Sequence, residues 1–460
     1  MLRRRLHSIH LGPSTRPVYH FFRMNGSPHA VSTPTNRPGI TAAQPPASTG
    51  HHDWIVAQLG AREHYAVPRA LERANRLDHF FTDAWCRWGR SVLRHGPALA
   101  RAFANRYHDD LSEGPVTSFN GMAVRNVLRR RQLQGADAAE QLARHHADVG
   151  RRFGEAVTAR LRERSLSPDR HAFFGFAVGS LEIIRHLNER GLLTVVDQIS
   201  PGPVERRIVA EEARRWPEWT DDVPKSHPVL EDRVAREWDA ADRVLVNSEW
   251  SRTALRQEGV PDEKLIVVPG AYEPPEGSEE PRPPRRDGPL RVLWLGNVIL
   301  RKGIPYLAQA AAQLAAADVE FHIVGPIGIT DAAVAKTPDN MTFVGPVSRN
   351  QTSAFYRRAD VFAFPTLSDG FGLTQLEAMA HGCPVIATPR CGRVVTDGED
   401  GFIVPPRDPE ALVDAVEQLL ADRERLRAMS NQARQTAQTY TLDAYAHRLF
   451  TAVDSCIEDS

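Results

Sequence analysis

Two acidic residues, Asp369 and Glu377, flank a glycine-containing turn in the C-terminal half of the chain. The segment 364–384 predicts a strand, a turn and a helix that Gly382 closes. The turn directs the backbone amides of residues 371–374 at whatever occupies the crevice, and these amides together with the helix dipole suit an anion. Carboxylates beside such an anion are suited to accept hydrogen bonds from sugar hydroxyls. The segment therefore predicts a site for a phosphorylated, hydroxyl-rich ligand.

Two cations, Arg301 and Lys302, stand in the loop between a predicted strand at 291–295 and a helix that Pro305 helps to start. Cations beside a helix N-terminus form the outline of a diphosphate site. A solvated basic pair in such a loop has the same sequence, so this segment alone leaves both interpretations open. Gly296 directly follows the strand and would let a ligand approach the backbone, although a tight turn requires glycine equally.

Two successive series of alternating strands and helices would position these residues. Short apolar runs predict N-terminal strands at 54–58, 78–82, 172–176, 192–196, 243–246 and 265–268. Similar runs predict C-terminal strands at 291–295, 320–324, 341–344, 361–364, 384–387 and 402–404. The region 91–164 is rich in Arg and Ala and is expected to be mainly helical. The pattern predicts two doubly wound, Rossmann-like α/β domains with ligands at the carboxyl ends of their strands.

The length of 460 residues exceeds what one hydrophobic core usually serves. Residues 1–50 carry arginines but no acidic residue, which predicts a disordered basic tail. An organellar transit peptide and an over-long gene start both remain open for this tail. Beyond it we expect an N-terminal domain at 51–273, a proline-rich linker at 274–289, a C-terminal domain at 290–440 and a closing helix at 441–460.

The composition argues against several classes of partner. The chain has 57 basic and 57 acidic residues, so nothing in its charge indicates a nucleic-acid ligand. Four cysteines without C-x-x-C spacing argue against a zinc site or a disulfide framework and favour the cytoplasm. No apolar run approaches the roughly 20 residues of a membrane helix, so we expect a soluble protein with at most peripheral contact at the inner membrane surface. A basic cluster at 125–131 fits either an anionic partner or a solvated helix face.

The pair Asp369 and Glu377, with seven residues between them, is followed by the segments 381–387 and 397–402. Together they resemble the signature of the retaining GT-B glycosyltransferases of family 4, the glycosyl transferases group 1. The resemblance covers nearly all of 290–450 and extends more loosely over the N-terminal half. It implies two Rossmann-like domains that face each other across a cleft, with the acceptor side at 51–273 and the nucleotide-sugar-binding domain at 290–440.

The same resemblance implies a retaining hexosyltransferase-type enzyme, of the kind that acts in polysaccharide biosynthesis. It would move a sugar from a nucleotide diphosphate sugar to a hydroxyl of a glycan, a lipid-linked molecule or a small molecule. The nucleotide sugar is a substrate in this scheme, so no cofactor is expected. The family is similar in needing no obligatory metal, and no persuasive D-x-D element stands at a strand end.

The resemblance also implies residue roles. Glu377 would bind the ribose hydroxyls, and Lys302 the diphosphate. Asp369, Lys302 and Arg301 are the expected catalytic set. The expected donor-binding set adds Phe371, Gly372, Leu373, Gly296 and Asn297, and Gly60 is expected on the acceptor side.

The chain departs from the family pattern at three points. Asp369 stands where the family usually has Glu, and Asn297 where it commonly has Arg, so we expect Arg301 to supply the guanidinium. No histidine follows the N-terminal strand near Phe176, where many relatives place one against the sugar.

Other functions on this architecture stay open. A non-catalytic nucleotide-sugar-binding subunit is distinguished by binding without turnover. A nucleotide-sugar epimerase and a glycan phosphorylase are further alternatives, and the lack of a lysine in a recognisable pyridoxal context argues against the phosphorylase. A dinucleotide dehydrogenase fits least, because the segment 325–328 lacks the full G-x-G-x-x-G fingerprint.

Overall fold

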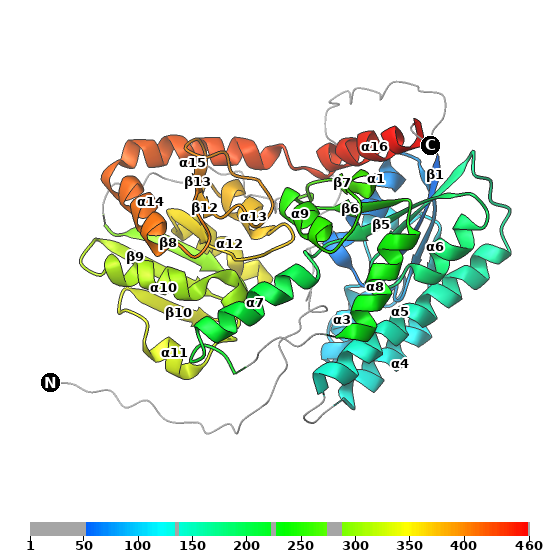
Figure 1. Cartoon of the computed structure of the whole chain (residues 1–460), viewed down its shortest axis with the longest axis horizontal. Helices are drawn as coiled ribbons and strands as arrows, with labels where there is room; N and C mark the ends of the chain where they lie inside the picture. The colour runs from blue at the N-terminus through cyan, green and yellow to red at the C-terminus, as the bar shows by residue number, and fades with distance from the viewer. Residues whose placement is uncertain (1–51, 134–137, 222–226, 274–287, 459–460) are drawn as a thin grey trace.

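The computed structural model describes residues 52–133, 138–221, 227–273 and 288–458, which fold around two parallel β-sheets (Figure 1). The predicted tail at 1–50 and nearly all of the predicted linker at 274–289 lie outside the described residues.

The N-terminal sheet has seven strands in the order β3-β2-β1-β4-β5-β6-β7, and every adjacent pair is parallel. The strands are β1 (Asp53–Gln58), β2 (Leu77–Thr82), β3 (Val116–Ser118), β4 (His171–Phe176), β5 (Leu193–Gln198), β6 (Arg243–Val246) and β7 (Leu265–Val267). The strand order reverses between β1 and β4, which is where an open α/β sheet has its ligand crevice. The region 91–164 is mainly helical, as predicted, and the short edge strand β3 is its one strand among the described residues. Three residues are too few to give a periodic signal in the sequence.

Helices cover both faces of this sheet. The helices of this half of the chain are α1 (Ala66–Arg73), α2 (Arg90–Leu93), α3 (Ala98–Ala104), α4 (Asn120–Arg131), α5 (Ala138–Arg162), α6 (Leu181–Asn188), α7 (Pro203–Arg215), α8 (Pro228–Ala240) and α9 (Glu249–Gln257). Alternate residues of β1 enter two different apolar clusters: Trp54 and Val56 pack on one face, and Ile55 and Ala57 on the other. A strand that is apolar on both faces requires cover on both, which explains its continuous apolar run.

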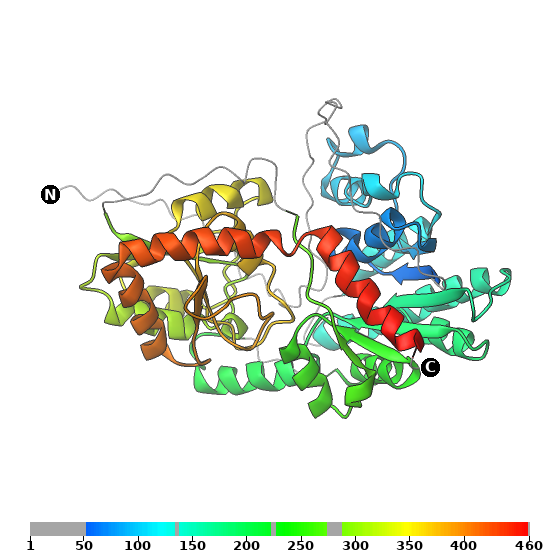
Figure 2. The same ribbon diagram turned by 90° about the horizontal axis from the view of Figure 1, so that it is seen from above.

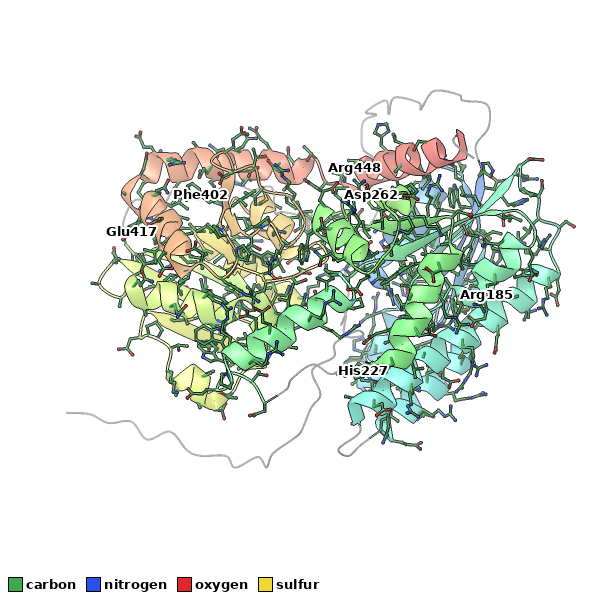
Figure 3. All side chains as sticks on the ribbon, in the orientation of Figure 1. Arg185, His227, Asp262, Phe402, Glu417 and Arg448 are labelled. Carbon is green, nitrogen blue, oxygen red and sulfur yellow. The ribbon has the colours of Figure 1, made fainter. Side chains whose placement is uncertain are left out.

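The C-terminal sheet has six parallel strands in the order β10-β9-β8-β11-β12-β13. The strands are β8 (Leu290–Leu295), β9 (Val319–Val324), β10 (Met341–Gly345), β11 (Val361–Phe364), β12 (Val385–Ala387) and β13 (Gly401–Ile403). The helices are α10 (Ile304–Gln313), α11 (Asp331–Ala335), α12 (Arg349–Arg358), α13 (Thr374–Ala380), α14 (Pro409–Ala421), α15 (Arg423–Gln438) and α16 (Leu442–Glu458). The Arg425 guanidinium of α15 lies 5.0 Å from the ring centroid of Phe402, whose side chain Figure 3 labels on β13.

Capping residues begin two helices of this half. Ser348 and Gln351 form a capping box at the start of α12. Asp408 caps α14 by accepting a hydrogen bond from the backbone amide of Ala411, and Pro409 occupies the first turn.

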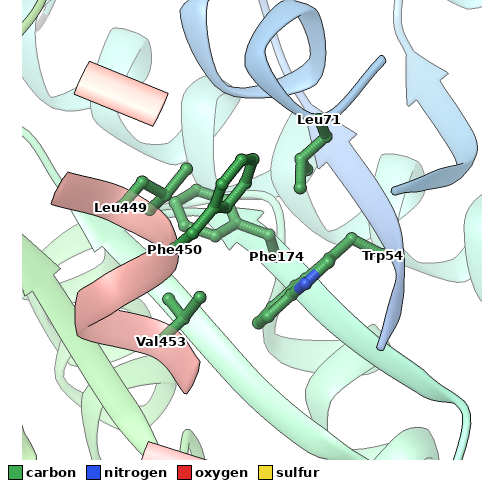
Figure 4. A pocket seen from close by; sticks show the side chains of 6 residues that line it. All are labelled: Trp54, Leu71, Phe174, Leu449, Phe450 and Val453. Atoms are coloured by element: carbon green, nitrogen blue, oxygen red, sulfur yellow. The ribbon is translucent and has the colours of Figure 1, made fainter. Parts of the chain in front are cut away.

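The last helix, α16, returns to the N-terminal half of the molecule (Figure 2). Its residues Leu449, Phe450 and Val453 face Trp54 of β1 and Phe174 of β4 (Figure 4). The predicted closing helix therefore exists, and its apolar stripe is buried against the first sheet.

Candidate nucleotide-sugar site

The loop between β8 and α10 carries Arg301 and Lys302 and packs directly on the loop that follows β11. Gly303 has φ +73°, and a Cβ atom there would lie 1.9 Å from the carbonyl oxygen of Pro365. The Leu367 amide donates a hydrogen bond of 2.8 Å to the carbonyl of Arg301. Glycine at this position therefore permits a close approach that brings the two loops together.

This approach places the predicted cations beside the first predicted acid. Lys302 Nζ donates a hydrogen bond to Asp369 Oδ2, and Arg301 Nη1 lies 3.8 Å from Asp369 Oδ1. The Lys302 ammonium also lies 4.9 Å from the ring centroid of Phe364. The structure therefore brings together the three residues that the sequence predicted as catalytic.

Burial and charge act in opposite directions on this cluster. Burial alone would raise the pKa of Asp369, but Lys302 and Arg301 outweigh burial and hold the pKa below its ordinary value. Burial lowers the pKa of Lys302, an effect that Asp369 opposes. The cluster therefore holds a carboxylate and two cations whose charges depend on one another.

The turn at 370–373 lies between this cluster and α13. Gly372 has φ +81°, and a Cβ atom there would lie 2.7 Å from the ring of Phe364. Among the described residues, no acceptor takes a hydrogen bond from the amides of residues 371–374, which are Phe371, Gly372, Leu373 and Thr374. The turn therefore presents a row of backbone donors at the start of α13, as the sequence predicted.

The second predicted acid, Glu377, is held by an aromatic group. The hydroxyl of Tyr356 on α12 donates a hydrogen bond of 2.9 Å to Glu377 Oε2. The Tyr356 ring stacks on the imidazole of His381 with 5.3 Å between centroids, and His381 Nδ1 lies 2.7 Å from the carbonyl oxygen of Glu377. Burial raises the pKa of Glu377, and Tyr356 and Arg349 oppose this shift.

Three other predicted residues, Gly296, Asn297 and Gly60, follow strands β8 and β1. Gly296 hydrogen-bonds through its amide to Val324, and a Cβ atom on Gly325 would lie 1.8 Å from the Gly296 carbonyl oxygen. Asn297 follows it in the same loop. On the N-terminal side, the Gly60 amide donates to Asp83 Oδ1 at 2.9 Å, so this amide already has a partner. No hydrogen bond joins these three residues to Lys302 or Asp369 in the part of the chain that the structure describes.

Sequence reasoning missed several residues that complete the site. Glu205 of α7 accepts hydrogen bonds from Arg301 and from Ser368, and Trp250 of α9 donates to Ser368 Oγ at 3.0 Å. Tyr356 was also missed. It lies on α12, the helix before β11, whereas Glu377 lies on α13, the helix after β11. Nothing in the sequence around Glu205 indicated that α7 reaches the C-terminal half.

Among the described residues, no group of three or more His, Cys, Asp or Glu side chains is arranged to hold a metal ion. No helix within the described ranges is long and apolar enough to cross a membrane. Neither observation tests the predicted metal independence or the predicted cytoplasmic location, which stay predictions.

Comparison with known proteins supports the interpretation of the C-terminal half. Residues 289–422 match the family model of the glycosyl transferases group 1. A D-inositol 3-phosphate glycosyltransferase from Corynebacterium urealyticum is 30% identical over 259 residues, which are 49% of this chain and 59% of the relative. The D-inositol 3-phosphate glycosyltransferase of Corynebacterium glutamicum is 31% identical over 245 residues, 48% of this chain and 58% of that protein. The chain thus spans less than two thirds of the length of these curated relatives.

Solved structures match over nearly the whole fold. Sucrose-phosphate synthase from Thermosynechococcus elongatus has a TM-score of 0.58 at 20% identity, covering 89% of this chain and 100% of that one. HepE from Anabaena, in complex with UDP and glucose, has a TM-score of 0.53 at 14% identity, covering 88% and 100%.

The chain has a GT-B fold with two Rossmann-like domains. The two parallel sheets with their helices show this, and so does the likeness to these solved structures. The family that residues 289–422 match is the glycosyl transferases group 1. The predicted fold class and the predicted family resemblance are both confirmed, whereas retention and membership of family 4 stay predictions.

Proposed function

We propose that this protein is a glycosyltransferase that moves a sugar from a nucleotide diphosphate sugar to an acceptor hydroxyl, with retention and without a metal. One observation carries the proposal. Lys302 and Arg301 meet Asp369 beside the amides of residues 371–374, which donate to no acceptor among the described residues, and the half-buried Glu377 lies on the helix that follows. Cations and amides suit a diphosphate, and the carboxylates suit sugar and ribose hydroxyls.

The donor would bind by exchanging partners within the charged cluster. The diphosphate takes Lys302 as its counter-ion, which releases Asp369 to accept a hydrogen bond from a hydroxyl of the transferred sugar. Glu377, oriented by Tyr356, accepts from the ribose hydroxyls. The complex of HepE with UDP and glucose, on the same fold, supports a nucleotide-sugar donor.

In the reaction, the bond between the anomeric carbon and the diphosphate oxygen breaks, and negative charge grows on the leaving diphosphate. Lys302, Arg301 and the amides of the turn stabilise that charge, and these groups are in place before the reaction begins. Retention follows if the acceptor oxygen attacks from the face that the diphosphate leaves. The departing phosphate oxygen then receives the proton of the acceptor hydroxyl.

The acceptor would bind against the carboxyl edge of the N-terminal sheet, where the loop of Gly60 follows β1. The loop after β11 reaches this edge, because a Cβ atom on Gly370 would lie 1.9 Å from the carbonyl oxygen of Ile199, directly after β5. The matched relatives are named for D-inositol 3-phosphate, so a phosphorylated cyclic alcohol is the first acceptor to test. A glycan or a lipid-linked hydroxyl is the next.

A screen of the purified protein against UDP-, GDP- and ADP-sugars tests the proposal. We expect one donor class to raise the unfolding temperature and to release nucleoside diphosphate slowly, in the presence of EDTA as in its absence. Glu377→Ala should lose both effects. Nuclear magnetic resonance of the product of a full transfer then reports the anomeric configuration.

Each other result has a defined meaning. Binding without release, even with acceptors present, would favour a nucleotide-sugar-binding subunit without catalytic activity. Inversion at the anomeric carbon would contradict retention, and loss of release in EDTA would contradict metal independence. If no nucleotide sugar binds, the assignment of this cluster as a donor site is wrong.

A further inference from the structure

Helix α7 follows a strand of the N-terminal sheet but packs with the C-terminal half of the molecule (Figures 1 and 2). Ala213 is buried in the same apolar cluster as Tyr306 and Leu307 of α10, and Ile208 and Trp216 pack against this cluster. The apolar side of α7 is therefore part of the core beneath the second sheet.

A buried carboxylate fastens the end of α7 in this position. Glu212 is fully buried and accepts a hydrogen bond of 2.7 Å from the hydroxyl of Tyr306. Arg407 Nε lies 2.6 Å from Glu212 Oε1, and Arg407 adopts φ +67°, which few non-glycine residues do. These contacts hold α7 against the domain that carries the candidate donor site.

The first turn of the same helix enters that site through Glu205. Glu205 Oε2 accepts from Arg301 Nη1 at 3.1 Å and from Ser368 Oγ at 3.2 Å. Its Oε1 takes no hydrogen bond from any of the described residues. The side chain is 20% exposed, so this second oxygen has access to what enters the site.

We propose that Glu205 is a specificity-determining residue of the donor site, whose Oε1 accepts a hydrogen bond from a hydroxyl of the transferred sugar. The inference rests on the proposed function and extends it to a residue from the other half of the chain. Arg301 Nη1 lies 3.1 Å from Glu205 and 3.8 Å from Asp369, so the two carboxylates border one space. A sugar with vicinal hydroxyls offers a donor to each of them.

The charges around Glu205 agree with this role. Burial raises the pKa of Glu205, and Arg301 and Lys302 oppose the shift while Asp369 adds to it. Two carboxylates and two cations thus share the site. A diphosphate brings further negative charge to the cations, and sugar hydroxyls then supply the hydrogen bonds that the carboxylates lose.

Calorimetric titration with a nucleotide and its sugar conjugate separates sugar recognition from diphosphate binding. The probes are UDP and UDP-glucose, followed by GDP with GDP-mannose and ADP with ADP-glucose if the first pair does not bind. We expect Glu205→Ala to weaken the nucleotide sugar by about 10- to 100-fold, the effect of one hydrogen bond to a charged group. Glu205→Gln keeps an acceptor oxygen and should lose less. The affinity for the free nucleoside diphosphate should stay within about threefold.

Glu211→Gln is the matched control, because Glu211 lies on α7 and pairs with Arg407 outside the site. Thermal unfolding of each variant, compared with that of the wild type, shows whether the fold is intact. A second readout is the ratio of affinities for UDP-glucose and UDP-galactose, which should change in Glu205→Gln because a purely structural residue would leave this ratio unchanged.

Three results would overturn the inference. Equal weakening of UDP and UDP-glucose would reduce Glu205 to a support for Arg301. Unchanged affinity for the nucleotide sugar in Glu205→Ala would remove Glu205 from the site. If the wild-type protein binds neither member of any pair, the proposed function fails as well, and this result is distinct from the first two.

Discussion

At the scale of single residues, the pair of Lys302 and Asp369 is the centre of the candidate site. Each group is mostly buried, with side-chain exposures of 13% and 16%, so each depends on the other to remain charged. A buried ion pair of this kind adds little to the free energy of unfolding, because both charges lose their hydration when the chain folds. Such a pair suits a binding site, because an entering diphosphate can replace Asp369 as the partner of Lys302.

Lys302→Met should lower the free energy of unfolding by about 1–3 kcal/mol, because it leaves the Asp369 carboxylate with Arg301 alone. The lowered pKa of Asp369 contributes stability above the ordinary pKa of an aspartate, and this stability is lost as the pH falls through the lowered value. The difference between wild type and variant should therefore be constant above about pH 5 and shrink below about pH 4. Urea unfolding across this range measures it, and a difference that grows in acid would contradict the pairing.

The pKa of Glu377 is shifted in the opposite direction to that of Asp369. Its pKa is raised by burial, so its carboxylate, which should accept the ribose hydroxyls, becomes protonated at a higher pH than an exposed glutamate. Affinity for the nucleoside diphosphate should fall as the pH is lowered from about 8 to about 5.

Tyr356→Phe removes a hydrogen bond that favours the carboxylate form of Glu377, so it should shift this decline to higher pH. Glu377→Gln cannot titrate at this position and should bind weakly with little change over the same range. Equal pH profiles in the wild type and in both variants would show that Glu377 does not contact the nucleotide.

The sequence predicted much of this cluster and missed part of it. Asp369, Lys302 and Arg301 follow strands β11 and β8, which are neighbours in the sheet, and a parallel sheet brings such loops to one edge. Gly296 and Asn297 begin the loop that carries Arg301 and Lys302, and Gly296 packs against Gly325. Strand-end reasoning finds the edge of a sheet but not which neighbour each residue of a loop meets there.

At the scale of elements, the loop that carries Lys302 depends on the glycine that follows it. Gly303 and Gly345 both adopt positive φ, +73° and +83°, so alanine strains the backbone similarly at each. They differ in their surroundings. A Cβ atom at 303 would meet the Pro365 carbonyl, whereas at 345 it would have no neighbour within 4 Å.

We therefore expect Gly345→Ala to cost about 1 kcal/mol of unfolding free energy and to leave donor binding intact. Gly303→Ala should cost more and should weaken the nucleotide sugar by at least about tenfold, because the loops of Lys302 and Asp369 must separate. Denaturation and calorimetric titration of both variants measure the difference. If the two variants bind the donor equally well, the contact between these loops is not needed for the site.

The same scale explains why α7 was assigned by sequence to the N-terminal half alone. Its position after β5 and its helical pattern fit an ordinary crossover helix. The apolar residues that mark its second partner, Ile208, Ala213 and Trp216, look the same in sequence whichever sheet they cover. Only the tertiary structure shows which core they join.

At the scale of the whole molecule, two helices join the domains in opposite directions. Helix α7 carries residues of the N-terminal half into the core of the C-terminal half, and α16 returns to cover β1 and β4. This exchange should couple the unfolding of the two halves, because neither core is complete without a segment that the other half holds.

Calorimetry should therefore show one cooperative transition. Glu212→Ala leaves the Arg407 guanidinium without its fully buried partner and should lower the free energy of unfolding by about 3 kcal/mol. It should also begin to separate the transitions of the two halves. Glu211→Ala, whose carboxylate is 45% exposed and contacts the same arginine, should cost less than about 1 kcal/mol. Two resolved transitions in the wild-type protein would contradict the coupling.

The most direct test of the central claim is the rate at which nucleoside diphosphate is released from the saturating donor that the screen identifies. If Lys302 stabilises the charge of the leaving diphosphate, Lys302→Met should lower kcat by about 100-fold or more, while Gly345→Ala releases it at nearly the wild-type rate. Release from Lys302→Met at the wild-type rate would contradict the account, because the diphosphate would then leave without the cation that defines the site.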